Sequence, residues 1–394
     1  MSTIPIDALR DIVGRFPTTR DEDWKYTDLA RARDISSRWL DAGGTRPSEM
    51  PDIAALVGDI DADWFVIANG RVAETPRADG VSVEKLAPPD GADALAEFNA
   101  ALLDAGLRLR IAGHPDRPVG LLFIDEAGAP SVSQGFVEIV FERGAHGEVI
   151  EYHASRGDGE HYGNTILHID IGDDAVARHV RLQDRALEHL QTHRTKVSVG
   201  RAAHFASASF DLGGGLVRND IDIDIAHPGA EVDFTGLYLA GDGQHIDNHT
   251  RVDHRVGPAT SRQEYRGILN GKCRCVWNGK AIVHEGADGT DADQANHNLL
   301  LSAQAEIDAK PELEIYTDDV KCSHGTTVGQ LDETALFYLR TRGLDRQHAT
   351  RVLTHAFAAG LVSRIPVAAA QEPVARLMER RLGELIRSDE DYPA

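Results

Sequence analysis

The chain has 394 residues, and 42% of them are hydrophobic, which is enough for a large buried core. Its 63 acidic and 41 basic side chains give a formal net charge of −22, which opposes nucleic acids and anionic membranes as partners. The start of the chain lacks the apolar run of a signal peptide, no stretch approaches a membrane span, and three cysteines are too few for a disulfide framework, so we expect a cytoplasmic protein.

The first 115 residues are expected to form an N-terminal domain of helical and mixed structure. Apolar side chains fall at helical spacing in 6–13 and again in 95–103, and each of these segments predicts a helix. A polar cap and acidic residues in 19–23 precede Trp24, which predicts that a further helix begins there.

Residues 116–328 change to the alternating pattern of β-strands, with breaks that contain glycine or aspartate. Long helical periods are hard to find in this part of the sequence. This disfavours folds that alternate strands with helices and leaves a sandwich, a barrel or a β-helix. Examples of the predicted strands are 137–142, 148–154, 165–171, 175–182, 203–212, 216–225, 232–240 and 263–269.

Two observations favour a parallel β-helix for this core. The strand segments outnumber those of a single sandwich, which usually has about seven to nine strands. In 297–301, Asn298 stands beside an apolar run, which is typical of the stacked bends of solenoids. No fixed-period repeat is evident in the sequence, so spacing alone leaves the other two architectures open.

Helical periodicity returns near the end of the chain, and we expect 329–394 to form a C-terminal helical domain. Residues 332–334 and Asp345 are placed to open two helices, and a third apolar face follows Pro366. The predicted architecture is therefore mainly β, with helical regions at both ends of the β core.

A thiol and an imidazole stand two residues apart at the end of this core. In an extended segment Cys322 and His324 project from the same face, where a thiolate and a neutral imidazole could bind zinc, iron or an iron–sulfur cluster. Gly325 follows at a predicted turn. The two residues alone are a weak signal because cysteine is among the most buried residue types, so their meaning depends on what surrounds them.

A second candidate is the trio His245, Asp247 and His249, which shares one face of a predicted strand. Two imidazoles and a carboxylate could bind a metal ion. The alternative is a polar outer face with Ile246 and Val252 directed inward, which we favour because nothing in the sequence fixes a fourth ligand. Phosphate-loop, dinucleotide-binding, zinc-protease and nucleophile-elbow motifs are absent from the sequence, so we expect no enzymatic activity.

The most specific pattern lies in 310–325 and continues through 328–329 and 336–343. This block resembles the SufB/SufD family of iron–sulfur cluster assembly scaffolds. Residues 23–27 and 298–301 add to the resemblance, which runs nearly end to end except for 40–90. In the SufB type a glutamate directly follows the histidine of the Cys-x-His motif. Gly325 occupies that place here, so the chain resembles the SufD type.

The resemblance implies a right-handed parallel β-helix flanked by helical regions. It implies a non-catalytic scaffold subunit of the SufBCD complex that forms a heterodimer with a SufB-type paralogue along the β-helix. The C-terminal helical domain would contact the ATPase SufC. Whether isolated chains form a homodimer stays open.

The resemblance also implies that His324, with Cys322 beside it, lies at the SufB interface and helps to hold iron or the nascent cluster. A scaffold must release its product, so incomplete ligation by one chain is expected. We therefore expect no cofactor bound tightly by this chain alone, only transient iron or cluster at the interface, with a flavin on the assembled complex left open. The alternative function is a stand-alone metal-binding β protein or enzyme that uses His245, Asp247 and His249.

Overall fold

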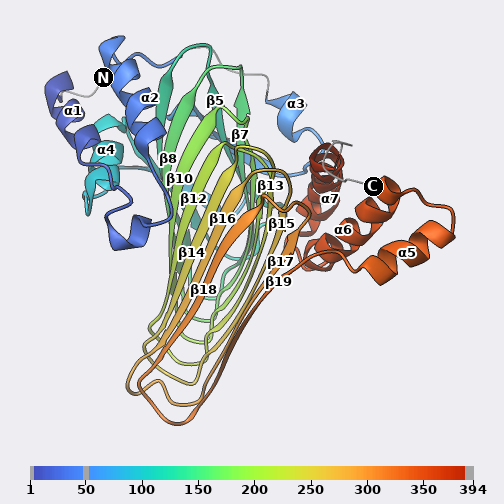
Figure 1. The fold of residues 1–394 in the computed structure, drawn as a ribbon. Helices are drawn as coiled ribbons and strands as arrows, with labels where there is room; N and C mark the ends of the chain where they lie inside the picture. Colours follow the sequence, from blue (N-terminus) through green and yellow to red (C-terminus); the bar gives the residue numbers. More distant parts are fainter. Residues whose placement is uncertain (1–3, 48–52, 387–394) are drawn as a thin grey trace.

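The computed structural model describes residues 4–47 and 53–386. Most of this chain forms a parallel β-helix of about seven turns, in which two long sheets face each other. From β5 onward consecutive strands alternate between the two sheets, so each turn adds one strand to each (Figure 1). The predicted fold class, a mainly β parallel β-helix with helical regions at both ends, is confirmed.

The strands that we call sheet A are listed here in their order across the sheet. They are β19 (Val320–Gly329), β17 (Thr290–Leu300), β15 (Thr260–Leu269), β13 (Glu231–Ala240), β11 (His204–Asp211), β9 (Val176–Asp184), β7 (His146–Arg156), β5 (Val119–Glu126), β1 (Asp63–Ala68) and β2 (Arg71–Glu74).

Sheet B follows the same order of turns on the opposite side. Its strands are β18 (Glu306–Ile315), β16 (Arg274–Val283), β14 (His245–His254), β12 (Leu216–Ile225), β10 (His189–Val199), β8 (His161–Ile171), β6 (Ser131–Phe141), β4 (Gly106–Ile111) and β3 (Val81–Leu86).

One turn of the β-helix takes about 30 residues, as shown by the pairing of Val119 with Val149 and of Ser131 with His161. Residues paired in register on neighbouring strands point to the same side of the sheet, so each inward position stacks on the one below it. The main apolar core lies between the sheets and is formed by side chains such as Phe141, Ile223 and Trp277.

Three N-terminal helices form an apolar cluster on part of the outer face of sheet B, mainly over β6 and β8 (Figure 1). They are α1 (Ile6–Gly14), α2 (Ala30–Asp41) and α4 (Ala94–Leu102). The helices expected in 6–13 and 95–103 are confirmed. The prediction of a helix from Trp24 is wrong, since a single 3₁₀ turn (Glu22–Trp24) forms there and α2 begins only at Ala30. The intervening segment instead buries the Thr27 side chain against sheet B.

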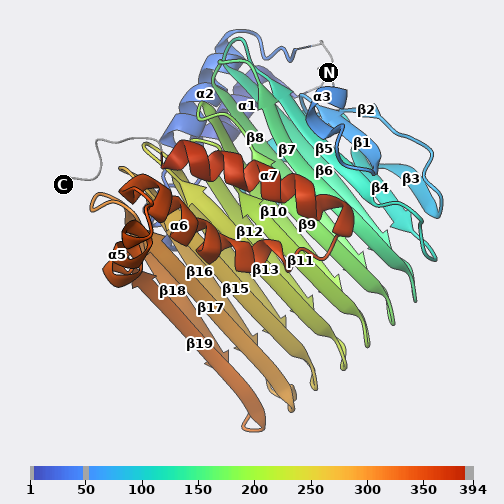
Figure 2. The same cartoon turned by 90° about the vertical axis from the view of Figure 1, so that its right-hand side faces the viewer.

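Two C-terminal helices, α6 (Arg346–Val362) and α7 (Ala368–Leu385), pack on the outer face of sheet A, and Figure 2 shows them crossing its strands. The short α3 (Ala54–Val57) joins the same apolar cluster, and α5 (Glu333–Thr341) packs against α6. Asp332 and Asp345 cap α5 and α6 as predicted. No helix in the described ranges is long and apolar enough to cross a bilayer.

Two local predictions are wrong because the strands continue through the expected bends. Gly325 lies in the middle of β19, and Asn298 lies within β17. The Asn298 side chain is buried between the sheets, where its amide donates to Asn296 Oδ1 at 2.6 Å. A satisfied internal hydrogen bond, and not a solvent-facing turn, accounts for this asparagine.

Candidate functional site at the open end of the β-helix

The β-helix ends at β18 and β19, which each hydrogen-bond to one neighbouring strand in the described chain. Their outer edges are therefore open. The inward-facing side chains of this last turn are also uncovered, because no further turn packs on them. Val328 is 54% exposed although it pairs in register with the buried Asn298. An open edge beside exposed apolar side chains is a surface suited to another chain.

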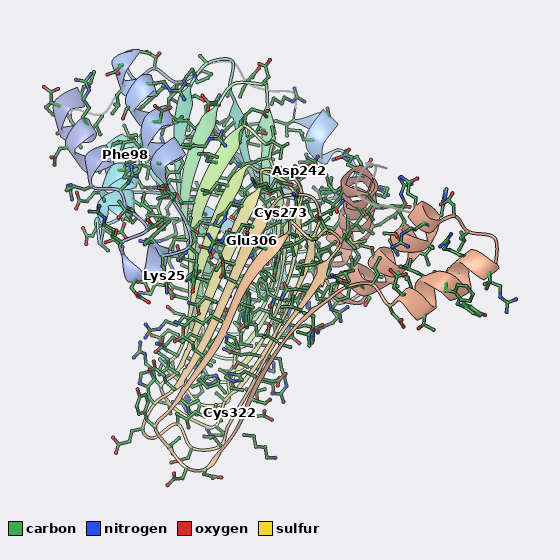
Figure 3. The ribbon with its side chains drawn as sticks, viewed as in Figure 1. Lys25, Phe98, Asp242, Cys273, Glu306 and Cys322 are labelled. Atoms are coloured by element: carbon green, nitrogen blue, oxygen red, sulfur yellow. The ribbon has the colours of Figure 1, made fainter. Side chains whose placement is uncertain are left out.

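Cys322 and His324 both lie on β19 within this last turn. They pair with Ala292 and Gln294 of β17, which are buried between the sheets, so both side chains belong to the inward face of the strand. Figure 3 places Cys322 near the lower tip of the β-helix, well away from Cys273 at the other end of the strands. The same-face prediction for Cys322 and His324 agrees with the strand geometry.

The surroundings of the two residues differ from those of a closed metal site. Cys322 is half-buried, and this burial raises the pKa of its thiol above the usual value. His324 is exposed. Two donors from one strand leave half of a metal coordination sphere empty, since structural zinc and cluster sites commonly use four protein ligands. A closed site at this end would need ligands from a second molecule.

The trio His245, Asp247 and His249 lies on β14, beneath the N-terminal segment. Ile246 and Val252 point into the main core, which agrees with the polar outer face favoured from the sequence. Asp247 is fully buried and accepts hydrogen bonds from Arg218 Nη1 at 2.5 Å and from the Thr27 hydroxyl. Burial alone would raise the pKa of Asp247, but Arg218 outweighs it and holds that pKa well below its ordinary value.

This arrangement anchors the N-terminal segment on sheet B. His245 Nε2 lies 2.8 Å from the Thr27 hydroxyl, and the Trp24 ring stacks over Arg218 with its centroid 4.6 Å from the guanidinium carbon. Asp247 thus already has a cation and a hydroxyl as partners. The contacts favour a structural role for the trio over a metal site.

A third group of potential ligands lies inside the β-helix, and the sequence reasoning missed it. Glu151 and His153 on β7, His179 on β9 and His193 on β10 gather around one carboxylate; we call these four residues the interior cluster. The available signal was Glu-x-His within a predicted strand, which places both side chains on one face. Finding the other two required the register of the turns, because His179 and His193 lie 28 and 42 residues beyond Glu151.

Comparisons with known proteins agree with this architecture. A family model described as the SufBD core domain of SUF-system iron–sulfur cluster assembly matches residues 123–357. The chain is 30% identical to the iron–sulfur cluster assembly protein SufD of Escherichia coli, over 93% of this chain and 90% of that protein.

Two further relatives are more distant. An iron–sulfur cluster assembly SufBD family protein of Synechocystis is 26% identical, over 92% of this chain and 87% of its own length. The iron–sulfur cluster assembly protein SufD of Bacillus subtilis is 24% identical, over 76% of this chain and 70% of its own length. The chain therefore belongs to the SufB/SufD family of iron–sulfur cluster assembly proteins and is of the SufD type.

Proposed function

We propose that this chain is a non-catalytic scaffold subunit of a SufBCD complex and pairs with a SufB-type paralogue through the open end of its β-helix. The single observation that carries this proposal is the coincidence of two open strand edges, an uncovered inward face and the Cys322/His324 pair in one turn. Adding strands to β18 and β19 would satisfy their backbone groups and cover the apolar side chains of the last turn.

In this proposal His324 helps to hold iron or the nascent cluster, together with ligands from SufB. A neutral imidazole binds iron, and its replacement of a thiolate changes the charge and lability of a cluster. Cys322 is the weaker candidate, because a thiol whose pKa is raised by burial is less readily converted to the thiolate that binds metal. Iron held at such an interface is cargo, and a flavin on the assembled complex remains a prediction.

We further propose that the C-terminal helical region, 329–394, docks the ATPase SufC. Phe337 and Tyr338 on α5 are 67% and 56% exposed, whereas Leu336 beside them is buried. Adjacent exposed aromatic side chains are typical anchors of protein interfaces. The division of the chain into 1–115, 116–328 and 329–394 belongs to the same proposal.

The test is co-expression with SufB and SufC, followed by cluster reconstitution with the His324→Ala variant. We expect the complex to form normally while assembled cluster falls at least about tenfold, because the imidazole is lost without a change in the strand pairing. Cluster content is measured by iron and sulfide analysis and by visible absorption.

The matched control is His297→Ala, since His297 lies on the adjacent β17 but on its outward face, with Nδ1 2.9 Å from the Thr327 hydroxyl. This variant is expected to assemble clusters as the wild type does. Normal assembly in the His324→Ala complex would remove His324 from the mechanism.

A further inference from the structure

The interior cluster places three imidazole nitrogens around one carboxylate. Nε2 of His153 and Nε2 of His193 lie 2.6 and 2.7 Å from Glu151 Oε1, and Nε2 of His179 lies 3.1 Å from Oε2. Glu151 and His153 are 0% exposed, and His193 and His179 are 1% and 5% exposed. Within 4–47 and 53–386, the ligand atoms of Glu151, His153 and His193 all lie within 4.8 Å of one another.

The charge balance of this cluster differs from that of the other carboxylates between the sheets. Asp125 is paired with the buried Arg185, and Asp211 with the buried Arg181. The side chains that the structure describes around Glu151 are imidazoles. A bound cation would supply to Glu151 the fixed positive charge that Arg185 and Arg181 supply to the other two carboxylates.

A transition-metal ion would bind the ionised carboxylate of Glu151 and the neutral form of each imidazole, and these donor atoms already converge on one point between the sheets.

Each imidazole also has a partner behind it. Nδ1 of His153 lies 3.2 Å from the side-chain amide of Gln191. Nδ1 of His193 lies 3.3 Å from the Thr195 hydroxyl, and Nδ1 of His179 lies 3.0 Å from the Ser207 hydroxyl. For Nε2 to bind a metal, the ring proton must lie on Nδ1, where the Thr195 hydroxyl can accept it from His193. The unpartnered Gln191 Oε1 can accept it from His153 after rotation of the amide. Such outer partners orient metal-binding histidines in proteins.

We propose that Glu151, His153 and His193 bind one divalent transition-metal ion, of the zinc or ferrous class, inside the β-helix, with His179 holding the second carboxylate oxygen of Glu151. The donor set of imidazoles and one carboxylate suits these ions. In a tetrahedral site, neighbouring ligand atoms are about 3.3 Å apart, so Nε2 of His153 and Nε2 of His193 would each move about 0.7 Å away from Glu151 Oε1. This inference goes beyond the proposed interface function and departs from the expectation that the isolated chain holds no metal tightly.

The position of the site determines how it is filled. A cavity of about 20 Å³ adjoins the cluster and is lined in part by His179, Thr195 and Ser207. It has room for about one water molecule, and the surrounding core closes the rest. Metal should therefore enter while the chain folds, and it should leave slowly afterwards.

The experiment uses the full chain, expressed in separate cultures supplemented with zinc, iron or cobalt and purified without chelator. We expect about one equivalent of metal in the wild type, four-coordinate visible absorption bands in the cobalt-loaded chain, and a higher unfolding temperature than in chain refolded with chelator. Glu151→Gln and His193→Gln should each lose most of the bound metal and the cobalt bands.

The control is the Cys322→Ala/His324→Ala double variant, which should keep the full equivalent because the open end is not involved. Loss of metal in this control, or full binding in both interior variants, would overturn the proposal. If the interior variants do not fold, the wild type decides: metal content far below one equivalent, or cobalt bands typical of thiolate ligands, would equally overturn it. Cluster assembly by the His324→Ala complex bears on the interface function alone.

Discussion

Asp247 lies under the N-terminal segment and connects it to sheet B through Arg218 and Thr27. Arg218 is 2% exposed, and it also pairs with Asp220 at 2.6 Å. Removing one member of a buried ion pair usually costs more than the pair contributes, because the partner charge is left desolvated. Loss of the Asp247 carboxylate should therefore lower the stability of the chain, although no functional role is proposed for this residue.

We predict that Asp247→Asn lowers the free energy of unfolding by about 2 kcal/mol, less than the ~3–5 kcal/mol of a sole partner because Asp220 remains. Denaturant unfolding at neutral pH measures the change. Asp222→Asn on the same outer face is the matched control. Burial and the neighbouring Asp220 raise the pKa of Asp222, so its ionised form is disfavoured and its replacement should leave stability unchanged or slightly higher. Equal losses in the two variants would contradict this account.

The pH dependence of the same variant has a definite sign. The pKa of Asp247 is lower in the folded chain than the value of about 3.9 in unfolded chains, so the folded state favours the carboxylate. The resulting stabilisation is complete above about pH 5 and is lost as the pH falls through the lowered pKa. The stability difference between wild type and Asp247→Asn should therefore shrink between neutral pH and about pH 3.

Helix α6 is held on sheet A by apolar packing and by polar contacts. Two of its buried side chains, Ala358 and Leu361, face the apolar outer surface of sheet A, and Val352 on the same helix is 47% exposed. Polar contacts add to the packing, since Arg364, just after the helix, donates to Asp233 at 3.0 Å. The apolar contact should dominate, because exposed ion pairs contribute at most about 1 kcal/mol.

We predict that Leu361→Ala destabilises the chain by about 3 kcal/mol, through lost burial and the cavity left behind. Val352→Ala should change stability by less than about 0.5 kcal/mol, because its side chain is half exposed. Thermal unfolding followed by circular dichroism compares the two. A similar loss in both variants would mean that α6 is not held by the side of the helix on which Leu361 lies.

The sequence predicted strands well wherever inward positions are apolar, as in β12 and β13. The alternation is hidden in β10, whose inward positions include His189, Gln191 and His193, so this strand does not stand out in the sequence. The same polar interior explains why the interior cluster was not found. Its members come from three strands, and only the pairing of successive turns brings them together. Cys322 and His324 were found because their motif is local to one strand.

At the scale of the whole molecule, the β-helix separates three surfaces. Helices cover part of the outer face of each sheet, and the last turn leaves its edges and inward face open (Figures 1 and 2). Val328 belongs to the open end, while Phe337 belongs to α5. Because different elements present these two exposed side chains, contacts with two partners can be tested separately.

We predict that Val328→Glu weakens binding to SufB at least about tenfold, equivalent to about 1.4 kcal/mol, because a charge would be buried against an apolar, hydrogen-bonded interface. Phe337→Glu should leave SufB binding unchanged and weaken SufC binding instead, so each variant serves as the control for the other. Affinity is measured with the purified partners, and circular dichroism checks that both variants fold. If Val328→Glu binds SufB normally, the open end is not the pairing surface, whereas loss of both partners in one variant would indicate a single continuous interface.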